Sequence, residues 1–238
     1  MKKHIPNSLT LLNLFSGCCG IVACLHNEYS LVPIFIGISL VADFLDGFVA
    51  RALKVKSELG GQLDSLADMV TFGVLPGMML YSIIVSTSNT EDCCSQLLPY
   101  IGFLYSVFAC LRLAKFNLDT RQTVDFIGLN TPSSAILILG LYMQYYTNWQ
   151  NNLDNQFLFY VKIVTIVIPI ILSYLLIAEF RMFSLKGNPF SWKQNKFRFL
   201  LIIFVFPQLF IFKWLGLSTI ILTYIIFAYL HNVNTNKL

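Results

Sequence analysis

Long apolar segments recur along the chain, separated by short polar ones. A helix needs about 20 residues to cross a hydrocarbon core of about 30 Å. Segments that approach this length predict eight transmembrane helices, at about 8–26, 31–52, 63–87, 97–116, 132–149, 158–178, 198–214 and 216–231. The last two meet around Gly216 and predict a helical hairpin. We therefore expect an all-α integral membrane protein, a polytopic helical bundle of about eight transmembrane helices.

The composition supports this class and excludes others. The chain has 238 residues, of which 56% are hydrophobic and 12% are charged, whereas a soluble domain carries roughly 25% charged residues. The net charge of +4 is modest and the basic residues are scattered, so a nucleic-acid partner is not expected. No internal repeat or low-complexity linker is visible, and we expect one domain over residues 1–238.

The basic residues predict the orientation in the membrane, because Lys and Arg are enriched in cytoplasmic loops. With a cytoplasmic N-terminus and eight spans, 14 of the 16 Lys and Arg residues lie on or near the cytoplasmic side. The exceptions are Lys162 and Lys213, and the opposite loops HNEYS, STSNTEDCCSQ and NWQNNLDNQ contain neither residue type. We expect both termini to face the cytoplasm.

Four aspartates interrupt the apolar pattern around the turn between the second and third spans. Asp43 and Asp46 precede the basic stretch RALKVKSE, and Asp64 and Asp68 follow the turn near Gly60-Gly61. In an antiparallel helical hairpin, Asp46 and Asp64 lie at one depth and Asp43 and Asp68 at another. Spacings of three and four residues keep each helix's pair on one face. The four carboxylates can therefore converge one to three turns below the cytoplasmic surface.

Clustered carboxylates at membrane depth mark a functional site, because they are costly there. They repel one another unless protons or cations neutralise them, and all-oxygen ligands suit Mg²⁺ or Mn²⁺. Two divalent ions would balance four carboxylates, and such pairs, about 3.5–4 Å apart, recur in displacement at phosphorus. Two alternatives remain: acids paired with nearby Arg and Lys, and an ion or proton transporter. A transporter would favour broken helices in two related halves, and no such repeat is visible.

Eight specified positions in this segment follow one another as Asp43-x2-Asp46-Gly47-x2-Ala50-Arg51-x8-Gly60-x3-Asp64-x3-Asp68. In identity and spacing they resemble the complete signature of the CDP-alcohol phosphatidyltransferases. The resemblance implies a catalytic core of six transmembrane helices, here residues 1–180, with 198–231 as an additional C-terminal hairpin. It also implies a homodimer in the cytoplasmic (inner) membrane, with a polar cavity open to the cytoplasm.

The resemblance also implies the chemistry. The family binds a CDP-linked lipid, an alcohol attacks the phosphorus on the lipid side, and CMP leaves. Divalent metal, as two Mg²⁺ or Mn²⁺ ions, is expected on Asp43, Asp46, Asp64 and Asp68. Asp68 is in addition the expected catalytic base, because a carboxylate within hydrogen-bond reach can take the proton of the attacking hydroxyl.

A further set of residues is expected to contact the CDP-lipid. The resemblance implies that small motif residues admit the cytidine, that a glycine after the turn contacts the nucleotide, and that the motif arginine neutralises phosphate charge. Two polar residues of the first helix either face the nucleotide or cap that helix. The set comprises Asn7 and Thr10 of the first helix, the small residues Gly47, Ala50 and Gly60, and Arg51.

Three other stretches resemble the phosphatidylserine synthase branch of this family: HIPNSLTLLNLFSGCCGI, RLAKFN and FIGLNTPSSA. That branch usually has RLARFN and GLPxP in the last two, so Lys115 and Asn130 are departures. Lys115 keeps the charge but loses the two-pronged geometry of Arg. The resemblance implies transfer of the phosphatidyl group from CDP-diacylglycerol to L-serine. The CDP-diacylglycerol is expected to lie among the lipids of the membrane.

Arg112 and Asn117 are the candidates for serine binding. Arg112 could hold the carboxylate by a two-pronged, charge-assisted contact, and Asn117 could orient the amino acid. Alternatively, Arg112 is an interfacial anchor at the end of the fourth span, and Asn117 is a helix C-cap. Another acceptor, such as glycerol 3-phosphate or an inositol phosphate, would use convergent basic residues, and Arg112 and Lys115 leave that open.

Overall fold

The structure is a computed structural model, and it describes residues 4–55, 57–88, 96–119, 126–150, 155–182 and 192–234. Its α-helices are α1 (His4–Leu25), α2 (Val32–Ala52), α3 (Glu58–Asp68), α4 (Leu75–Thr87), α6 (Gly102–Leu118), α7 (Thr131–Gln144), α8 (Asn155–Ile177), α9 (Trp192–Phe212) and α10 (Leu215–Asn234). Three short helical segments continue them: the π-helices η1 (Met69–Val74) and η3 (Tyr145–Trp149), and the 3-10 helix η2 (Leu98–Ile101).

Each of the eight apolar segments predicted from the sequence falls on a helical segment, and α3, η1 and α4 form one continuous helix. Six segments of the described chain are long and apolar enough to cross a membrane: His4–Leu25, Val32–Ala52, Glu58–Thr87, Leu98–Leu118, Gln156–Ile177 and Leu215–Asn232. The prediction of a polytopic helical membrane protein is confirmed.

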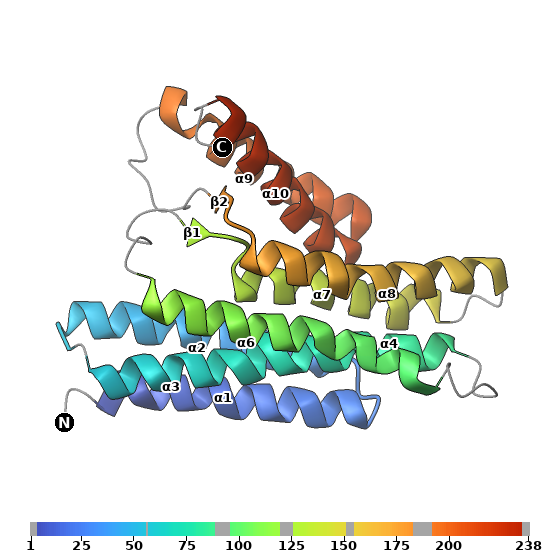
Figure 1. Cartoon of the computed structure of the whole chain (residues 1–238), viewed down its shortest axis with the longest axis horizontal. Coiled ribbons are helices and arrows are strands. Elements are labelled where there is room, and N and C mark those ends of the chain that lie inside the picture. Colours follow the sequence, from blue (N-terminus) through green and yellow to red (C-terminus); the bar gives the residue numbers. More distant parts are fainter. Residues whose placement is uncertain are drawn as a thin grey trace.

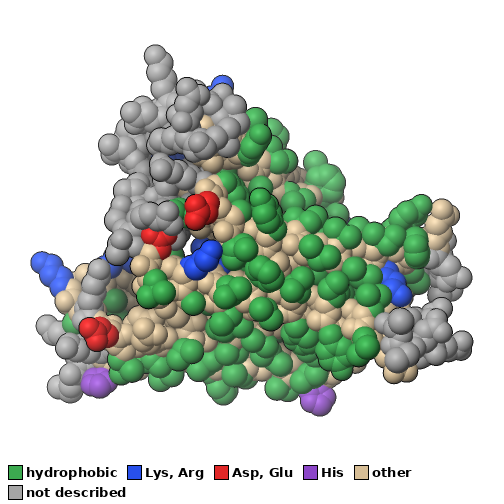
Figure 2. Space-filling view, in the orientation of Figure 1, with side chains coloured by type: hydrophobic (Ala, Val, Ile, Leu, Met, Phe, Trp, Pro, Cys, Tyr) green, Lys and Arg blue, Asp and Glu red, His purple; other side chains and the backbone are tan. Residues whose placement is uncertain are grey.

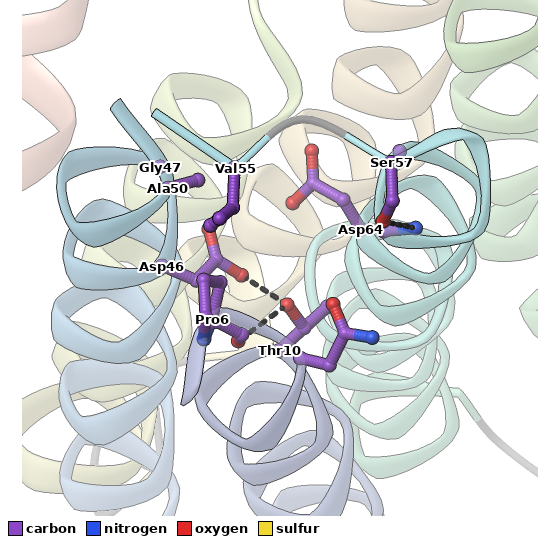
Figure 3. Close-up of a pocket in the computed structure, with 11 residues that line it drawn as sticks. Pro6, Thr10, Asp46, Gly47, Ala50, Val55, Ser57 and Asp64 are labelled. Carbon is purple, nitrogen blue, oxygen red and sulfur yellow. Dashed lines mark hydrogen bonds between the residues drawn. The ribbon is translucent and has the colours of Figure 1, made fainter. Parts of the chain in front are cut away.

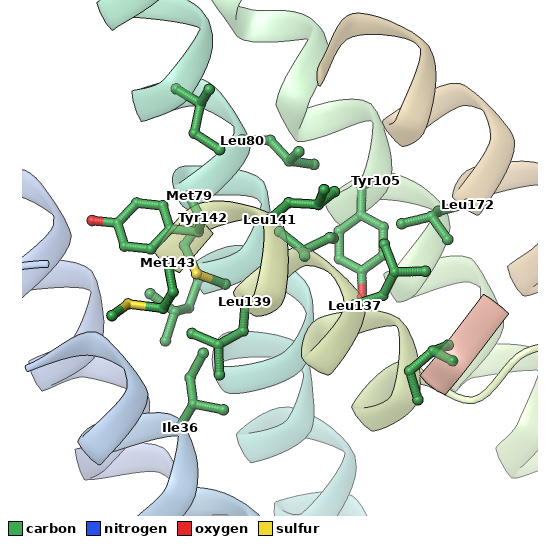
Figure 4. Close-up of a cluster of buried hydrophobic side chains, with 14 of the residues drawn as sticks. Ile36, Met79, Leu80, Tyr105, Leu137, Leu139, Leu141, Tyr142, Met143 and Leu172 are labelled. Carbon is green, nitrogen blue, oxygen red and sulfur yellow. The ribbon is translucent and has the colours of Figure 1, made fainter. Parts of the chain in front are cut away.

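The helix α7 lies in the interior of the bundle, and its side chains form much of the hydrophobic core (Figure 4). The fully buried Tyr105 of α6 donates a 2.8 Å hydrogen bond to the Phe72 carbonyl oxygen of η1. On another side, Ser218 of α10 donates to the Leu137 carbonyl oxygen of α7 at 2.7 Å. Gly140 permits this close approach, because a Cβ there would lie 2.8 Å from the Ser218 backbone nitrogen.

The helices α9 and α10 form the predicted C-terminal hairpin, which runs obliquely to the other helices (Figure 1). Gln208 of α9 donates to Thr223 of α10 at 2.9 Å, which joins the two helices by a side-chain hydrogen bond. Two short strands, β1 (Phe126–Ile127) and β2 (Arg181–Met182), pair antiparallel. They tie the segment before α7 to the segment after α8, near the end of the bundle that carries the α2–α3 turn (Figure 1).

The α2–α3 turn is shaped by local hydrogen bonds. Lys54 adopts a left-handed conformation with φ of 54°, and the Val55 N–H donates to the Ala50 carbonyl oxygen at 3.0 Å. This pattern ends a helix by satisfying a free carbonyl group. Ser57 then caps α3, because its hydroxyl oxygen accepts a 3.0 Å hydrogen bond from the Gly60 N–H. The turn therefore reverses the chain between the two aspartate-bearing helices, and both of them pack against α1.

The view in Figure 2 shows apolar side chains over the middle of the bundle and most of the visible charged ones near the α2–α3 turn. Many large apolar side chains are exposed, including Phe15, Phe44, Phe206 and Phe210. An exposed apolar surface of this extent is expected of helices that face lipid.

The predicted orientation can be measured by chemical labelling. In a variant without its six cysteines, we expect Glu28→Cys and Glu58→Cys to react with a membrane-impermeant thiol reagent from opposite sides of sealed vesicles. Both glutamates are exposed, and they lie at opposite ends of α2. Labelling before and after detergent gives the total for each site. Labelling of both sites from the same side would refute the predicted topology.

Candidate active site

Three of the four motif aspartates meet between α2 and α3. Asp43, Asp64 and Asp68 each offer a carboxylate oxygen within 4.8 Å of the others. All three are partly buried, so their mutual repulsion is weakly screened. The Asp64 Oδ1 atom is buried and has no hydrogen-bond partner among the described residues. An anionic oxygen group of this kind fits a hard divalent cation.

Asp46 lies beside this group and faces a first cavity of about 280 Å³ (Figure 3). Asp46 is buried, and its Oδ2 atom accepts a 2.5 Å hydrogen bond from the Thr10 hydroxyl of α1. The cavity is lined by Pro6, Asn7 and Thr10 of α1, by Asp46, Gly47 and Ala50 of α2, by Val55 and Ser57 of the turn, and by Gly60, Gly61 and Asp64 of α3. We call it the α1–α3 cavity.

Five of the six residues expected to contact a CDP-lipid therefore line the α1–α3 cavity. Asn7 and Thr10 lie within α1, and the Thr10 hydroxyl donates to Asp46 across the cavity wall. A Cβ on Gly60 would lie 3.3 Å from Asn7 Oδ1, so a larger residue would narrow the space. Arg51, the sixth residue, is exposed, and its Nη1 would lie 3.3 Å from a Cβ on Gly47. It therefore stands next to the wall of the cavity.

A second cavity, of about 240 Å³, shares Asp64 with the first. Its walls are Asp43, Asp64, Ser65 and Asp68 of α2 and α3, Arg112, Leu113, Phe116 and Asn117 of α6, and Asn130, Thr131 and Pro132 at the start of α7. We call it the α6–α7 cavity. The aspartate group thus separates two spaces of different chemistry, one lined by small residues and the other by an arginine and amides.

Arg112 is buried in the wall of the α6–α7 cavity, with 7% of its surface exposed. Its Nε atom has no hydrogen-bond partner among the described residues, and its guanidinium carbon lies 6.0 Å from the ring centre of Phe116. This burial disagrees with the alternative of an anchor at the membrane interface. A buried donor without a partner can instead receive an anionic ligand.

Asn117 lies in the last turn of α6 and is hydrogen-bonded to Ser65 of α3. Its Nδ2 donates to Ser65 Oγ at 2.9 Å, and the Ser65 hydroxyl is 3.1 Å from Asn117 Oδ1. The C-cap position belongs to Asp119, so the capping alternative is not found. Asn117 therefore connects α6 to the segment between Asp64 and Asp68.

The sequence interpretation missed two asparagines. Asn130, a departure from the family pattern, is the N-cap of α7 and accepts from the Ser133 N–H at 3.0 Å; an Asn shortly before a Pro is a recognisable helix start. Asn13 is completely buried, and its Nδ2 donates to Asp68 Oδ1 at 3.1 Å. The signal that could have identified Asn13 from the sequence is its position three residues after Thr10, which itself lies three residues after Asn7.

Comparison with known proteins gives matches of one kind over most of the chain. The family model described as CDP-alcohol phosphatidyltransferase matches residues 3–168. A CDP-diacylglycerol–serine O-phosphatidyltransferase of Bacillus subtilis (strain 168) is 36% identical over 147 residues, 60% of this chain and 77% of the relative. A protein of the same name from Methanocaldococcus jannaschii is 35% identical over 136 residues, 57% of this chain and 59% of the relative. Another, from Helicobacter pylori (strain 26695), is 26% identical over 227 residues, 94% of this chain and 88% of the relative.

Proposed function

The chain belongs to the CDP-alcohol phosphatidyltransferase family, and from this we propose that it transfers the phosphatidyl group of CDP-diacylglycerol to the hydroxyl of L-serine, releasing CMP. The observation that supports this most is the pair of cavities that meet at Asp64. A donor and an acceptor held in separate spaces on either side of one carboxylate group can approach a phosphorus from opposite directions.

The α1–α3 cavity is the proposed donor site. Gly47, Ala50 and Gly60 leave room for the cytidine, and Arg51 stands at its edge to balance phosphate charge. The Mg²⁺ or Mn²⁺ ions would be held by Asp43, Asp46, Asp64 and Asp68. Two divalent ions would balance the charge of the four carboxylates. When bound, these ions would neutralise the pyrophosphate and stabilise the charge on departing CMP.

The α6–α7 cavity is the proposed acceptor site. Arg112 would bind the serine carboxylate through its buried, unpartnered donor. Asp68, on the wall of the same cavity, would take the hydroxyl proton as the oxygen attacks. Through its hydrogen bonds with Ser65, Asn117 would hold α6 in register with α3. This would fix the distance between Arg112, which binds the serine carboxylate, and the base Asp68.

The membrane setting forms part of this proposal. The site lies near the α2–α3 turn, at the end of the bundle that we place at the cytoplasmic face of an inner membrane. A shallow site lets the acyl chains of CDP-diacylglycerol stay in the bilayer while water-soluble serine enters from the cytoplasm. We further propose that the protein works as a homodimer, as the family does.

The direct test is CMP release from CDP-diacylglycerol by the purified protein with a panel of acceptors. We expect release to depend on L-serine and to be at background with glycerol 3-phosphate and with inositol phosphate. The Asp43→Asn variant serves as the inactive control. CMP release driven by a phosphorylated alcohol would reassign the acceptor. Absence of CMP release with every acceptor would refute the proposed enzymatic activity.

Arg112→Lys tests the acceptor site. It keeps the positive charge but loses the planar pair of donors. A hydrogen bond between charged groups is worth about 1.5–3 kcal/mol, so we expect the KM for serine to rise roughly 10- to 100-fold. The KM for CDP-diacylglycerol should change far less. Steady-state kinetics in detergent, with each substrate varied in turn, measures both.

Lys115→Arg is the matched control, because Lys115 lies in the same stretch but does not line the α6–α7 cavity. It restores the usual residue of the family pattern and should leave both KM values near those of the wild type. Equal increases for the two substrates in Arg112→Lys would mean that Arg112 supports the fold and does not bind serine.

A further inference from the structure

We propose that Asn13 is a positioning residue, which orients the Asp68 carboxylate toward the acceptor cavity. The inference rests on the proposed function, because it concerns the base of that reaction. Asn13 Nδ2 donates a 3.1 Å hydrogen bond to Asp68 Oδ1. Asp68 lines the α6–α7 cavity, whereas Asn13 is completely buried and is not among the residues lining that cavity. The amide thus engages Oδ1 and limits how the carboxylate can turn against the acceptor cavity.

The backbone of Asn13 is held in place by α2 and by η1. Its backbone carbonyl oxygen accepts a hydrogen bond from the Ser39 hydroxyl of α2 at 3.2 Å, and another from the Thr71 hydroxyl of η1 at 3.1 Å. The π-helical segment η1 begins directly after Asp68, and such segments are frequent at functional sites. Asn13 therefore lies where α1 joins the helix of Asp43 to the segment that follows Asp68.

The approach of α1 to η1 depends on a residue one turn further along. A Cβ on Gly17 would lie 3.1 Å from the Thr71 Cα and would overlap the Thr71 hydroxyl. A larger residue at 17 would push the two helices apart and lengthen the contact between Asn13 and Asp68. The sequence therefore supplies both the amide and the glycine that lets it reach the carboxylate.

The other end of the Asn13 amide argues against a purely structural role. Asn13 Oδ1 is buried and has no hydrogen-bond partner among the described residues. A buried polar atom without a partner costs stability, and an apolar side chain would avoid that cost. The contact with Asp68 is the one hydrogen bond that the side chain makes in the described structure, and it links Asn13 to the reaction.

In the reaction, this bond limits rotation of the Asp68 carboxylate, so that one oxygen stays directed at the acceptor hydroxyl. Misplacing a catalytic group by about 1 Å can cost about 10²-fold in rate. Loss of the bond should therefore lower kcat, while metal-dependent binding of CDP-diacylglycerol in the α1–α3 cavity should persist. Asn13→Asp keeps the size of the side chain but puts a carboxylate oxygen where the donor was, so its effect should exceed that of Asn13→Ala.

The experiment measures kcat, metal-dependent CDP-diacylglycerol binding by calorimetry, and the unfolding temperature in detergent, for Asn13→Ala and Asn13→Asp. We expect kcat for Asn13→Ala to fall at least about 10-fold and the Kd to stay within about twofold of wild type. In an Asp68→Asn background the same substitution should change kcat less than about twofold, because Asn13 then has no base to orient. Ser82→Ala is the matched control: it removes a buried hydroxyl that is 2.6 Å from the Tyr146 hydroxyl, and it should show no coupling to Asp68.

Each outcome decides the inference. Equal losses of kcat in the wild-type and Asp68→Asn backgrounds, or a parallel loss of binding and turnover, would make Asn13 a structural residue. Failure of both Asn13 variants to fold would do the same. The assay uses whichever acceptor drives CMP release by the wild-type protein, so a wrong acceptor overturns the proposed function and leaves this test in place. Absence of release with every acceptor would overturn both.

Discussion

Removal of divalent metal is expected to abolish CMP release completely, and addition of Mg²⁺ or Mn²⁺ is expected to restore it. The reason is electrostatic. Asp43, Asp64 and Asp68 bring carboxylate oxygens within 4.8 Å of one another, and Asp46 and Asp64 face the cavity proposed for the nucleotide. A pyrophosphate brought into this space without cations would meet like charges in a partly buried setting, where repulsion is strong.

The measurement is CMP release after treatment with EDTA and removal of the chelator by dialysis. The unfolding temperature in detergent should be recorded alongside, so that loss of activity is not mistaken for loss of structure. A titration with each ion then gives the concentration that restores half of the activity. Full release after rigorous chelation would refute any role of metal in the reaction.

The positions of the helices followed from hydrophobicity, but their ends did not. The third span was predicted to begin at 63, whereas α3 begins at Glu58, directly after its cap Ser57. The hydropathy of a window falls where polar residues enter, although a helix continues until a cap or a left-handed residue ends it. The pairing of β1 with β2 could not be predicted either, because it joins Phe126 to Met182 and depends on where α6 and α8 end.

The site was predictable where its residues belong to one helical hairpin. The spacing of Asp43 and Asp68 around the turn indicated their convergence, because the depth and face of each residue follow from counting along two adjacent helices. The contacts of Asn13 with Asp68 and of Ser65 with Asn117 join helices that are distant in sequence. They depend on how α1 and α6 rotate against α3, which a periodic pattern in one sequence leaves open.

The aspartates are expected to divide into residues needed for binding and one needed for turnover. Asp68→Asn keeps the size of the side chain and much of its hydrogen bonding but removes the base. We expect this variant to bind CDP-diacylglycerol with metal, yet to turn over at least about 10²-fold more slowly, the low end for loss of a general base. Asp43→Asn and Asp46→Asn should instead lose metal-dependent binding of the lipid nucleotide.

The physical basis is that binding and proton removal make different demands on charge. Binding of a pyrophosphate requires cations, and cations require the carboxylates that neutralise them. Removal of the hydroxyl proton matters only as the acceptor attacks. The cavities agree with this division for two of the residues, because Asp46 lines the α1–α3 cavity, whereas Asp68 lines the α6–α7 cavity beside Arg112. Asp43 also lines the α6–α7 cavity, and its assignment to binding rests on its place in the carboxylate group.

Calorimetry in detergent, with and without metal, separates the two effects, and single-turnover CMP release measures the chemical step on the bound substrate. Asp119→Asn is a suitable control, because Asp119 lies outside both cavities and its loss should leave metal-dependent binding intact. If Asp68→Asn abolishes binding as fully as Asp43→Asn does, Asp68 acts chiefly as a ligand. The hydroxyl proton must then leave by a route that does not pass through this carboxylate, and the inference that Asn13 orients a base would be overturned.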